Sequence, residues 1–198
     1  MDASFAKSET LTGAALAPLD WARSVGLVVA FSLLTALSAQ IVVPMWPVPI
    51  TGQTFAVLLT GALLGSRLGA AAMIVYLIEG ASGLPFFQQG HGGIPYLLGP
   101  TGGYLVAFPA AAFITGAFAE HGWDKRFFTA AAAMAIGSVL ILLSGWAWFS
   151  IIMRTSPVVS FQLVVAKFII GDIVKILLAA AVLPSGWALL RRSASPKD

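Results

Sequence analysis

Long apolar segments alternate with short stretches rich in glycine, proline and charged residues along the 198-residue chain. A helix needs roughly 17 to 25 apolar residues to cross the core of a bilayer, and fewer where it is buried in a bundle. The segments that meet this requirement are 21–43, 54–64, 69–84, 103–119, 127–153 and 158–183. The pattern therefore predicts an all-α, polytopic membrane protein of six transmembrane helices, with Pro184 and Gly186 closing the last helix.

The predicted helices form one domain over residues 21–190. Residues 1–20 are small and polar and lack the basic start and apolar core of a signal peptide, so they are predicted to be a cytoplasmic N-terminal tail. Residues 191–198 are predicted to be a basic C-terminal tail.

Composition agrees with a membrane location. Hydrophobic residues make up 59% of the chain, charged residues 10%, and the mean hydropathy is +0.92, whereas soluble domains carry roughly 25% charged residues. The net charge of +3 fits lysine and arginine in cytoplasmic loops beside anionic headgroups, so nucleic-acid binding is not indicated. The absence of cysteine excludes disulfides, thiolate metal sites and a cysteine nucleophile.

The basic residues orient the predicted bundle, because lysine and arginine collect in loops that stay in the cytoplasm. With the N-terminus inside, Arg154 is the only basic loop or tail residue that falls outside. The others fall inside: Lys7, Arg23, Arg67, Lys125, Arg126, Arg191, Arg192 and Lys197. Both termini are therefore predicted to be cytoplasmic, and the uncharged loops 44–53 and 85–102 to face out.

Four charged residues remain inside the predicted helices: Glu79, Lys167, Asp172 and Lys175. Asp172 and Lys175 share a helix face one turn apart, so they either hold a polar ligand between them or bond to each other as an internal ion pair. A charge deep in a bilayer costs at least ~2.5 kcal/mol, which favours a function for this pair. Lys167 lies nearer the outer end of its helix, where it can reach the headgroups, so a structural role is predicted.

Three polar runs in or beside the outer loops indicate a pocket: VPITGQT, GLPFFQQGHGG and GPTGGYL. Non-helical backbone at membrane depth survives only where it is buried or lines a cavity. Aromatic rings with a few neutral hydrogen-bonding groups are typical of small-molecule sites. The predicted ligand-binding residues are Gln53, Gln88, His91, Tyr104, Asp172 and Lys175.

Four motifs occur in one order: PVPITGQTFAVLLTGALLGSRLG, YLIEGASGLPFF, GGIPYLLGPTGGYLVAF and GDIVK. Over about residues 25–185 the chain thereby resembles BioY, the biotin-capturing S component of energy-coupling factor (ECF) vitamin transporters. The resemblance implies an S-component-like bundle in a bacterial or archaeal plasma membrane, which binds biotin from outside. It also implies delivery of biotin with a T-type transmembrane subunit and two ATPase subunits.

The resemblance further implies that Asp172 and Lys175 of the GDIVK motif bind biotin, and that His91 supplies a polar contact. Glu79 departs from the family pattern, which is apolar there. Asp172 can accept a ureido N–H, whereas Lys175 can either donate to the ureido carbonyl or balance the carboxylate. Biotin and membrane lipid are the expected small partners, and no cofactor or metal is expected.

Two other classes of protein compete with a binding subunit as interpretations of the sequence. An intramembrane enzyme is disfavoured, because the two histidines, His91 and His121, fall on opposite sides of the membrane in the predicted topology. A self-sufficient, proton-coupled carrier of biotin or a related small carboxylate is the better alternative, with Glu79, Asp172 and Lys175 as a proton relay. The chain has no phosphate-binding G-x-x-x-x-G-K-[ST] loop, so it is not expected to handle ATP itself.

Small residues spaced four apart on the first predicted helix indicate a close-packing face. These residues are Ser32 with Ala36 and Thr35 with Ala39. Such spacing lets two helix backbones approach, although it is common in membrane helices. They are predicted to form the face that docks the T-type subunit.

Overall fold

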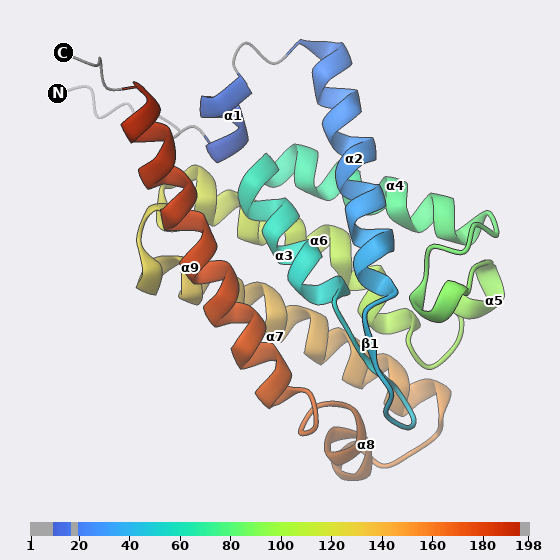
Figure 1. Cartoon of the computed structure of the whole chain (residues 1–198). Helices are drawn as coiled ribbons and strands as arrows, with labels where there is room; N and C mark the ends of the chain where they lie inside the picture. Colours follow the sequence, from blue (N-terminus) through green and yellow to red (C-terminus); the bar gives the residue numbers. More distant parts are fainter. Residues whose placement is uncertain (1–9, 17–19, 195–198) are drawn as a thin grey trace, which may run out of the picture.

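Helices form most of the regular structure in the computed structural model, which describes residues 10–16 and 20–194 (Figure 1). The α-helices are α1 (Leu11–Leu16), α2 (Trp21–Ala39), α3 (Gln53–Leu64), α4 (Ser66–Ala81), α5 (Ile94–Leu97), α6 (Gly102–Glu120), α7 (Phe127–Ile152), α8 (Pro157–Val164) and α9 (Ile169–Ala194). Two 3₁₀ turns, η1 (Gln88–Gly90) and η2 (Trp123–Lys125), lie in connecting segments. Strands β1 (Val42–Val43) and β2 (Ile50–Thr51) form an antiparallel hairpin.

Helix α6 occupies the centre of the bundle and packs against α3, α4 and α7 (Figure 1). In its most apolar stretch 61% of the residues are buried within the chain, compared with 22% for α2 and for α9. The outer helices therefore keep long apolar faces exposed, as expected where lipid covers them.

Glycines let the central helices approach closely. A Cβ atom at Gly61 of α3 would collide with the backbone of Ala112 on α6, and one at Gly116 of α6 would collide with the backbone of Gly65. Membrane helices associate largely through such small-residue contacts, because apolar burial against lipid gives little net gain. Direct backbone contact thereby determines how closely α3 and α6 approach each other.

The first predicted helix, 21–43, is too long, because α2 ends at Ala39 and residues 42–43 form a strand. Pro44 disfavours continuation of the helix, because it lacks an amide N–H and restricts the residue before it. The β-branched Val42 and Val43 suit a strand, and they pair with Thr51 and Ile50. The fold is thus helical with one short hairpin.

The last predicted helix, 158–183, is also wrong, because it is broken between Val164 and Ile169 into α8 and α9. At the break the carbonyl of Val164 accepts a hydrogen bond from the Tyr104 hydroxyl at 2.7 Å, and the Phe168 N–H bonds to Val165 instead. Pro184 does not close α9, which continues to Ala194 and into the predicted C-terminal tail. A proline removes one intrahelical hydrogen bond, and α9 tolerates that loss.

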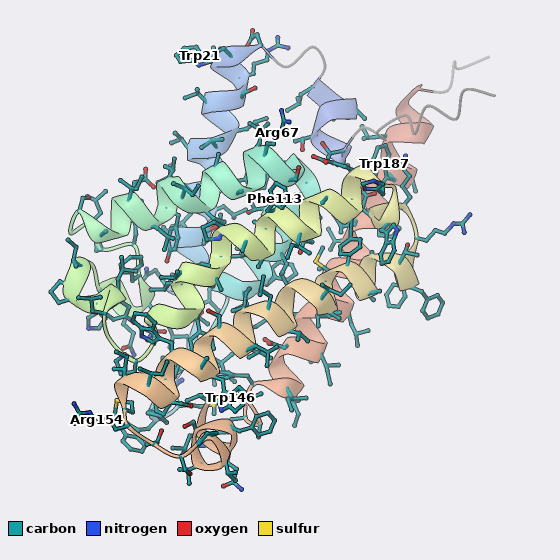
Figure 2. The ribbon with its side chains drawn as sticks, turned by 180° about the vertical axis from the view of Figure 1, so that it is seen from behind. Trp21, Arg67, Phe113, Trp146, Arg154 and Trp187 are labelled. Carbon is teal, nitrogen blue, oxygen red and sulfur yellow. The ribbon has the colours of Figure 1, made fainter. Side chains whose placement is uncertain are left out.

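Four described helices are long and apolar enough to cross a membrane by length and composition: α2, α6, α7 and α9. Helices α3 and α4 have 12 and 16 residues, so the count of six spanning helices stays a prediction. Arg67 and Arg154 lie at opposite ends of the bundle, and Trp21 and Trp187 lie at the Arg67 end (Figure 2). This separation matches the predicted division of the basic residues, while the side that faces the cytoplasm is untested.

The predicted N-terminal tail is partly structured. Residues 1–9, including Lys7, lie outside the described part of the chain. Helix α1 packs on α3 and α9, with Leu11 against Gly186. The first described helix therefore lies beside the C-terminal half of α9.

Candidate functional site

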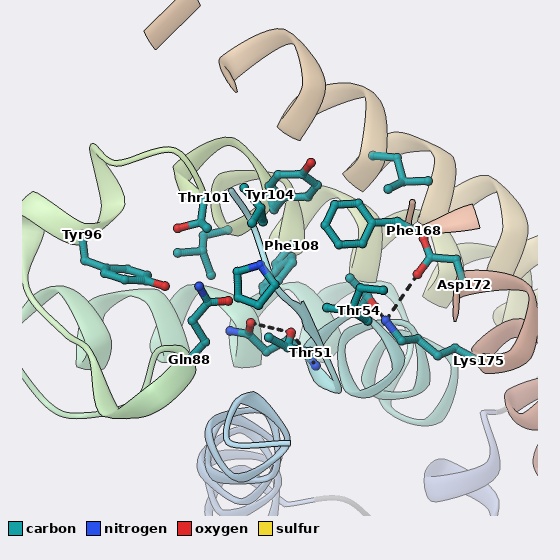
Figure 3. A pocket seen from close by; sticks show the side chains of 16 residues that line it. Thr51, Thr54, Gln88, Tyr96, Thr101, Tyr104, Phe108, Phe168, Asp172 and Lys175 are labelled. Carbon is teal, nitrogen blue, oxygen red and sulfur yellow. Dashed lines mark hydrogen bonds and ion pairs between the residues drawn. The ribbon is translucent and has the colours of Figure 1, made fainter. Parts of the chain in front are cut away.

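One cavity lies among the hairpin, α3, α6, α9 and the segment that carries η1 and α5 (Figure 3). Its lining atoms enclose about 500 Å³ of empty space, the open mouth included. Apolar and aromatic side chains form most of the wall, and they include Val48, Ile50, Leu105, Phe108, Leu142 and Phe168. Such a composition, with a few polar groups, is typical of a small-molecule site.

A charged pair forms one end of the cavity (Figure 3). The Lys175 ammonium lies 3.3 Å from the Asp172 carboxylate and donates to the Thr54 hydroxyl at 2.7 Å. Asp172 is only 6% exposed, and its other oxygen accepts from the Ser138 hydroxyl at 2.8 Å. Four side chains from three helices, α3, α7 and α9, thus form one hydrogen-bonded chain.

The break before α9 explains why the pair sits at the cavity. Asp172 falls in the first turn of α9, where the positive end of the helix dipole stabilises a carboxylate. Lys175 follows one turn later on the same face.

The pair retains hydrogen-bonding capacity. An ammonium has three N–H donors, and among the described residues Lys175 uses two, toward Asp172 and Thr54. Each carboxylate oxygen of Asp172 carries a second lone pair. The charged end can therefore offer both a donor and an acceptor to a ligand.

Two of the predicted pocket residues line the cavity while their polar groups bond to the protein. The Gln53 amide accepts from Thr51 at 2.8 Å and donates to the Tyr76 hydroxyl at 2.5 Å. The Tyr104 hydroxyl donates to the Val164 carbonyl. These side chains therefore shape the wall, and their contact with a ligand remains a prediction.

The end of the cavity opposite the ion pair is neutral (Figure 3). Gln88 lines it, as do Tyr96 and Thr101. The Tyr96 hydroxyl is buried beside Gln88 and Thr101 without a well-formed hydrogen bond. A buried polar group without a partner costs about 1–3 kcal/mol, so this hydroxyl favours binding a polar ligand atom.

His91 lies outside the cavity lining. Its ring stacks on Tyr96 with centroids 5.0 Å apart, and its Nδ1 bonds to the Gln88 carbonyl at 2.8 Å. His91 is exposed and contacts two lining residues, Tyr96 and Gln88, without lining the cavity itself. Its direct contact with a ligand stays a prediction.

The small residues of α2 that are predicted to dock a T-type subunit pack inside this chain. Ser32, Thr35, Ala36 and Ala39 are all buried within the chain. They face the chain's own helices: Ser32 donates to the Glu79 carboxylate of α4, and Thr35 lies against Met73. The close contact that their spacing predicts is formed inside the chain, and docking of a T-type subunit at this face stays a prediction.

Glu79 does not belong to the cavity lining. Its carboxylate is held by Ser32 between α2 and α4. The structure therefore does not bring Glu79 together with Asp172 and Lys175 as a proton relay would require.

Several lining residues gave no signal that singled them out. Thr54 ends the quoted VPITGQT run, and Tyr96 and Thr101 flank LLGP in another motif. Ser138, which does not line the cavity but bonds to Asp172, lies in an alanine-rich stretch of α7 without any mark of function. A neutral polar side chain costs little free energy in a membrane helix bundle, so its presence alone does not indicate a functional site.

Bundle and cavity together define a helical membrane protein with an apolar-walled cavity that carries a charged pair at one end. Comparison with known proteins then gives the family: the BioY family model matches residues 7–192, and the chain belongs to the BioY family. The resemblance seen in the sequence is thereby confirmed.

Named relatives agree with this assignment. The chain is 43% identical over 155 residues to the probable biotin transporter BioY of Pyrococcus horikoshii, covering 78% of this chain and 90% of that one. It is 34% identical over 161 residues to the biotin transporter BioY of Rhizobium etli, covering 78% and 83%. These relatives are transporters, which is consistent with a chain that is not an enzyme.

A solved structure shares the fold. The crystal structure of the S component for biotin from an ECF-type ABC transporter superposes with a TM-score of 0.76 at 24% identity. The likeness covers 86% of this chain and 92% of that chain. The bundle is therefore S-component-like.

Proposed function

We propose that this chain captures biotin in the cavity as the S component of an ECF-type transporter. The observation that carries the proposal is the buried pair Asp172–Lys175 at the end of an apolar, aromatic-walled cavity, in a family whose named relatives are biotin transporters. Biotin needs acceptors for its ureido N–H groups, a donor for its carbonyl or carboxylate, and apolar walls for its ring. The cavity offers each of these.

The two ends of the cavity suit the two ends of such a ligand. Lys175 keeps one N–H and Asp172 keeps acceptor capacity at the charged end. Gln88 and the buried Tyr96 hydroxyl offer neutral polar groups at the other end. Either orientation of biotin pairs one polar group of the ligand with each end.

The proposal includes a T-type subunit and two ATPase subunits that energise delivery, six spanning helices, cytoplasmic termini and a plasma-membrane location. The absence of a phosphate-binding loop in the sequence supports a separate source of ATP hydrolysis. The position of Glu79, held by Ser32 away from the cavity, argues against the proton-coupled carrier.

The direct test is isothermal titration of the purified chain with biotin. Saturable binding at about micromolar Kd or tighter is expected. Pentanoate, which has the carboxylate chain of biotin without its ring system, serves as the control and should bind far more weakly. A folded chain that gives no saturable heat with biotin would reject the proposed function.

A further inference from the structure

The turn that brings Gln88 to the cavity is closed by its own backbone. The Phe87 N–H donates to the His91 carbonyl at 2.9 Å, and the His91 N–H donates to the Gln88 carbonyl at 3.3 Å. Gln89 completes the turn in the left-handed region, with φ 56°. The Gln88 side chain points from this turn into the cavity (Figure 3).

A single amide from α2 holds both sides of that turn. The Nε2 group of Gln40 donates to the Phe87 carbonyl at 3.1 Å, and its Oε1 accepts from the Gly90 N–H at 2.9 Å. Phe87 and Gly90 flank Gln88 in the chain. The same Nε2 also donates to the Ala36 carbonyl at 3.1 Å, so the amide is fixed to α2 itself.

We propose that Gln40 is a positioning residue for ligand binding, which fixes the turn of residues 87–91 so that Gln88 enters the cavity. This inference rests on the proposed function for its ligand, biotin. Gln40 is exposed and is not a lining residue. Any effect of Gln40 on affinity therefore passes through the turn.

The turn survives the loss of Gln40, because Phe87 anchors it independently. The Phe87 ring is fully buried, lies edge-on to Tyr76 and stacks on Tyr96. Removing the Gln40 amide therefore breaks its hydrogen bonds to Phe87 and Gly90, while the Phe87 ring remains packed on Tyr76 and Tyr96. The expected consequence is a wider range of orientations for Gln88, with the fold intact.

Gln40→Met removes the two hydrogen bonds to the turn, together with the one to Ala36, at similar side-chain length. Its matched control is Gln162→Met, a change of an exposed glutamine on α8 outside the cavity lining. In protein without biotin, hydrogen exchange of the peptide that contains the Gly90 amide should be faster in Gln40→Met and unchanged in Gln162→Met. Unchanged hydrogen exchange in Gln40→Met would overturn the proposal that Gln40 fixes the turn, and this measurement does not depend on biotin binding.

Affinity then separates positioning from a general structural role. Gln40→Met should raise the Kd for biotin about tenfold in the presence of Gln88, and less than about twofold in a Gln88→Ala background, because a positioning residue acts only through the residue it positions. No change with Gln88 present, or an equal change in both backgrounds, would overturn the proposal. If Gln40→Met does not fold, Gln40→Glu is used, since it keeps the acceptor for Gly90 and loses the Nε2 donor to Phe87 and Ala36.

Discussion

Asp172→Asn tests the charged end of the cavity with almost no change in volume. The amide removes the negative charge that Lys175 faces at 3.3 Å and leaves Thr54 as the remaining acceptor of the Lys175 ammonium among the described residues. Asn can still accept from Ser138 through its carbonyl oxygen. The substitution therefore isolates the charge of Asp172 from its packing.

The size of the effect follows from burial. Breaking a buried ion pair by removing one partner costs ~3–5 kcal/mol, and each ~1.4 kcal/mol is a factor of ten in affinity. Where biotin completes the hydrogen bonds of this pair, Asp172→Asn should weaken binding at least about 100-fold. Ser138→Ala, which leaves the charge and removes one hydrogen bond, should weaken it only about tenfold.

The assay is isothermal titration of purified variants with biotin, with the thermal midpoint of each variant measured in parallel. Asp124→Asn is the matched control, because Asp124 is also a buried carboxylate, is 2% exposed and does not line the cavity. It should bind biotin with unchanged affinity. Wild-type affinity in folded Asp172→Asn and Lys175→Met would refute the assignment of the pair to the site.

Two further predictions concern residues whose bonds stay within the protein. Tyr104→Phe leaves the Val164 carbonyl without its donor, so the free energy of unfolding should fall by about 1–3 kcal/mol. Biotin affinity should fall less than about tenfold. A large loss of affinity at unchanged stability would mean that the hydroxyl contacts biotin. Burial raises the pKa of Asp124, and the hydrogen bond from Trp187 opposes this shift only in part. A raised carboxyl pKa gives stability that is present below the unfolded pKa of about 3.9 and is lost as pH rises through the folded pKa. The thermal midpoint of wild type should therefore fall relative to that of Asp124→Asn as pH rises above about 4. Parallel pH profiles of the two proteins would contradict this.

The sequence predicted the long helices well because their apolar runs are bounded by prolines and glycines. It failed where apolar composition alone does not distinguish one backbone from another. Val42 and Val43 are as apolar in a strand as in a helix, and the break between Val164 and Ile169 lies within an apolar run. The break depends on the Tyr104 hydroxyl, which comes from a helix distant in sequence.

The candidate site shows a similar division. Asp172 and Lys175 could be predicted because charge is costly in a bilayer. Thr54 and Ser138, which bond to the pair, could not, because neutral hydroxyls are common in membrane helices. The spacing of Ser32 and Ala36 predicted a close helix contact, but spacing does not identify the neighbouring helix, which is α4 of the same chain.

The break before α9 connects the fold to the site. An unbroken helix would place Asp172 in its interior, away from the positive end of the helix dipole. Because the chain starts a new helix at Ile169, Asp172 lies in a first turn, and the helix dipole offsets part of the cost of its buried charge. The same break frees the Val164 carbonyl for Tyr104 and places Lys167 where it donates to the Trp46 carbonyl of the hairpin at 3.3 Å. One interruption of an apolar run thus holds the hairpin, orients Tyr104 and stabilises the carboxylate at the end of the cavity.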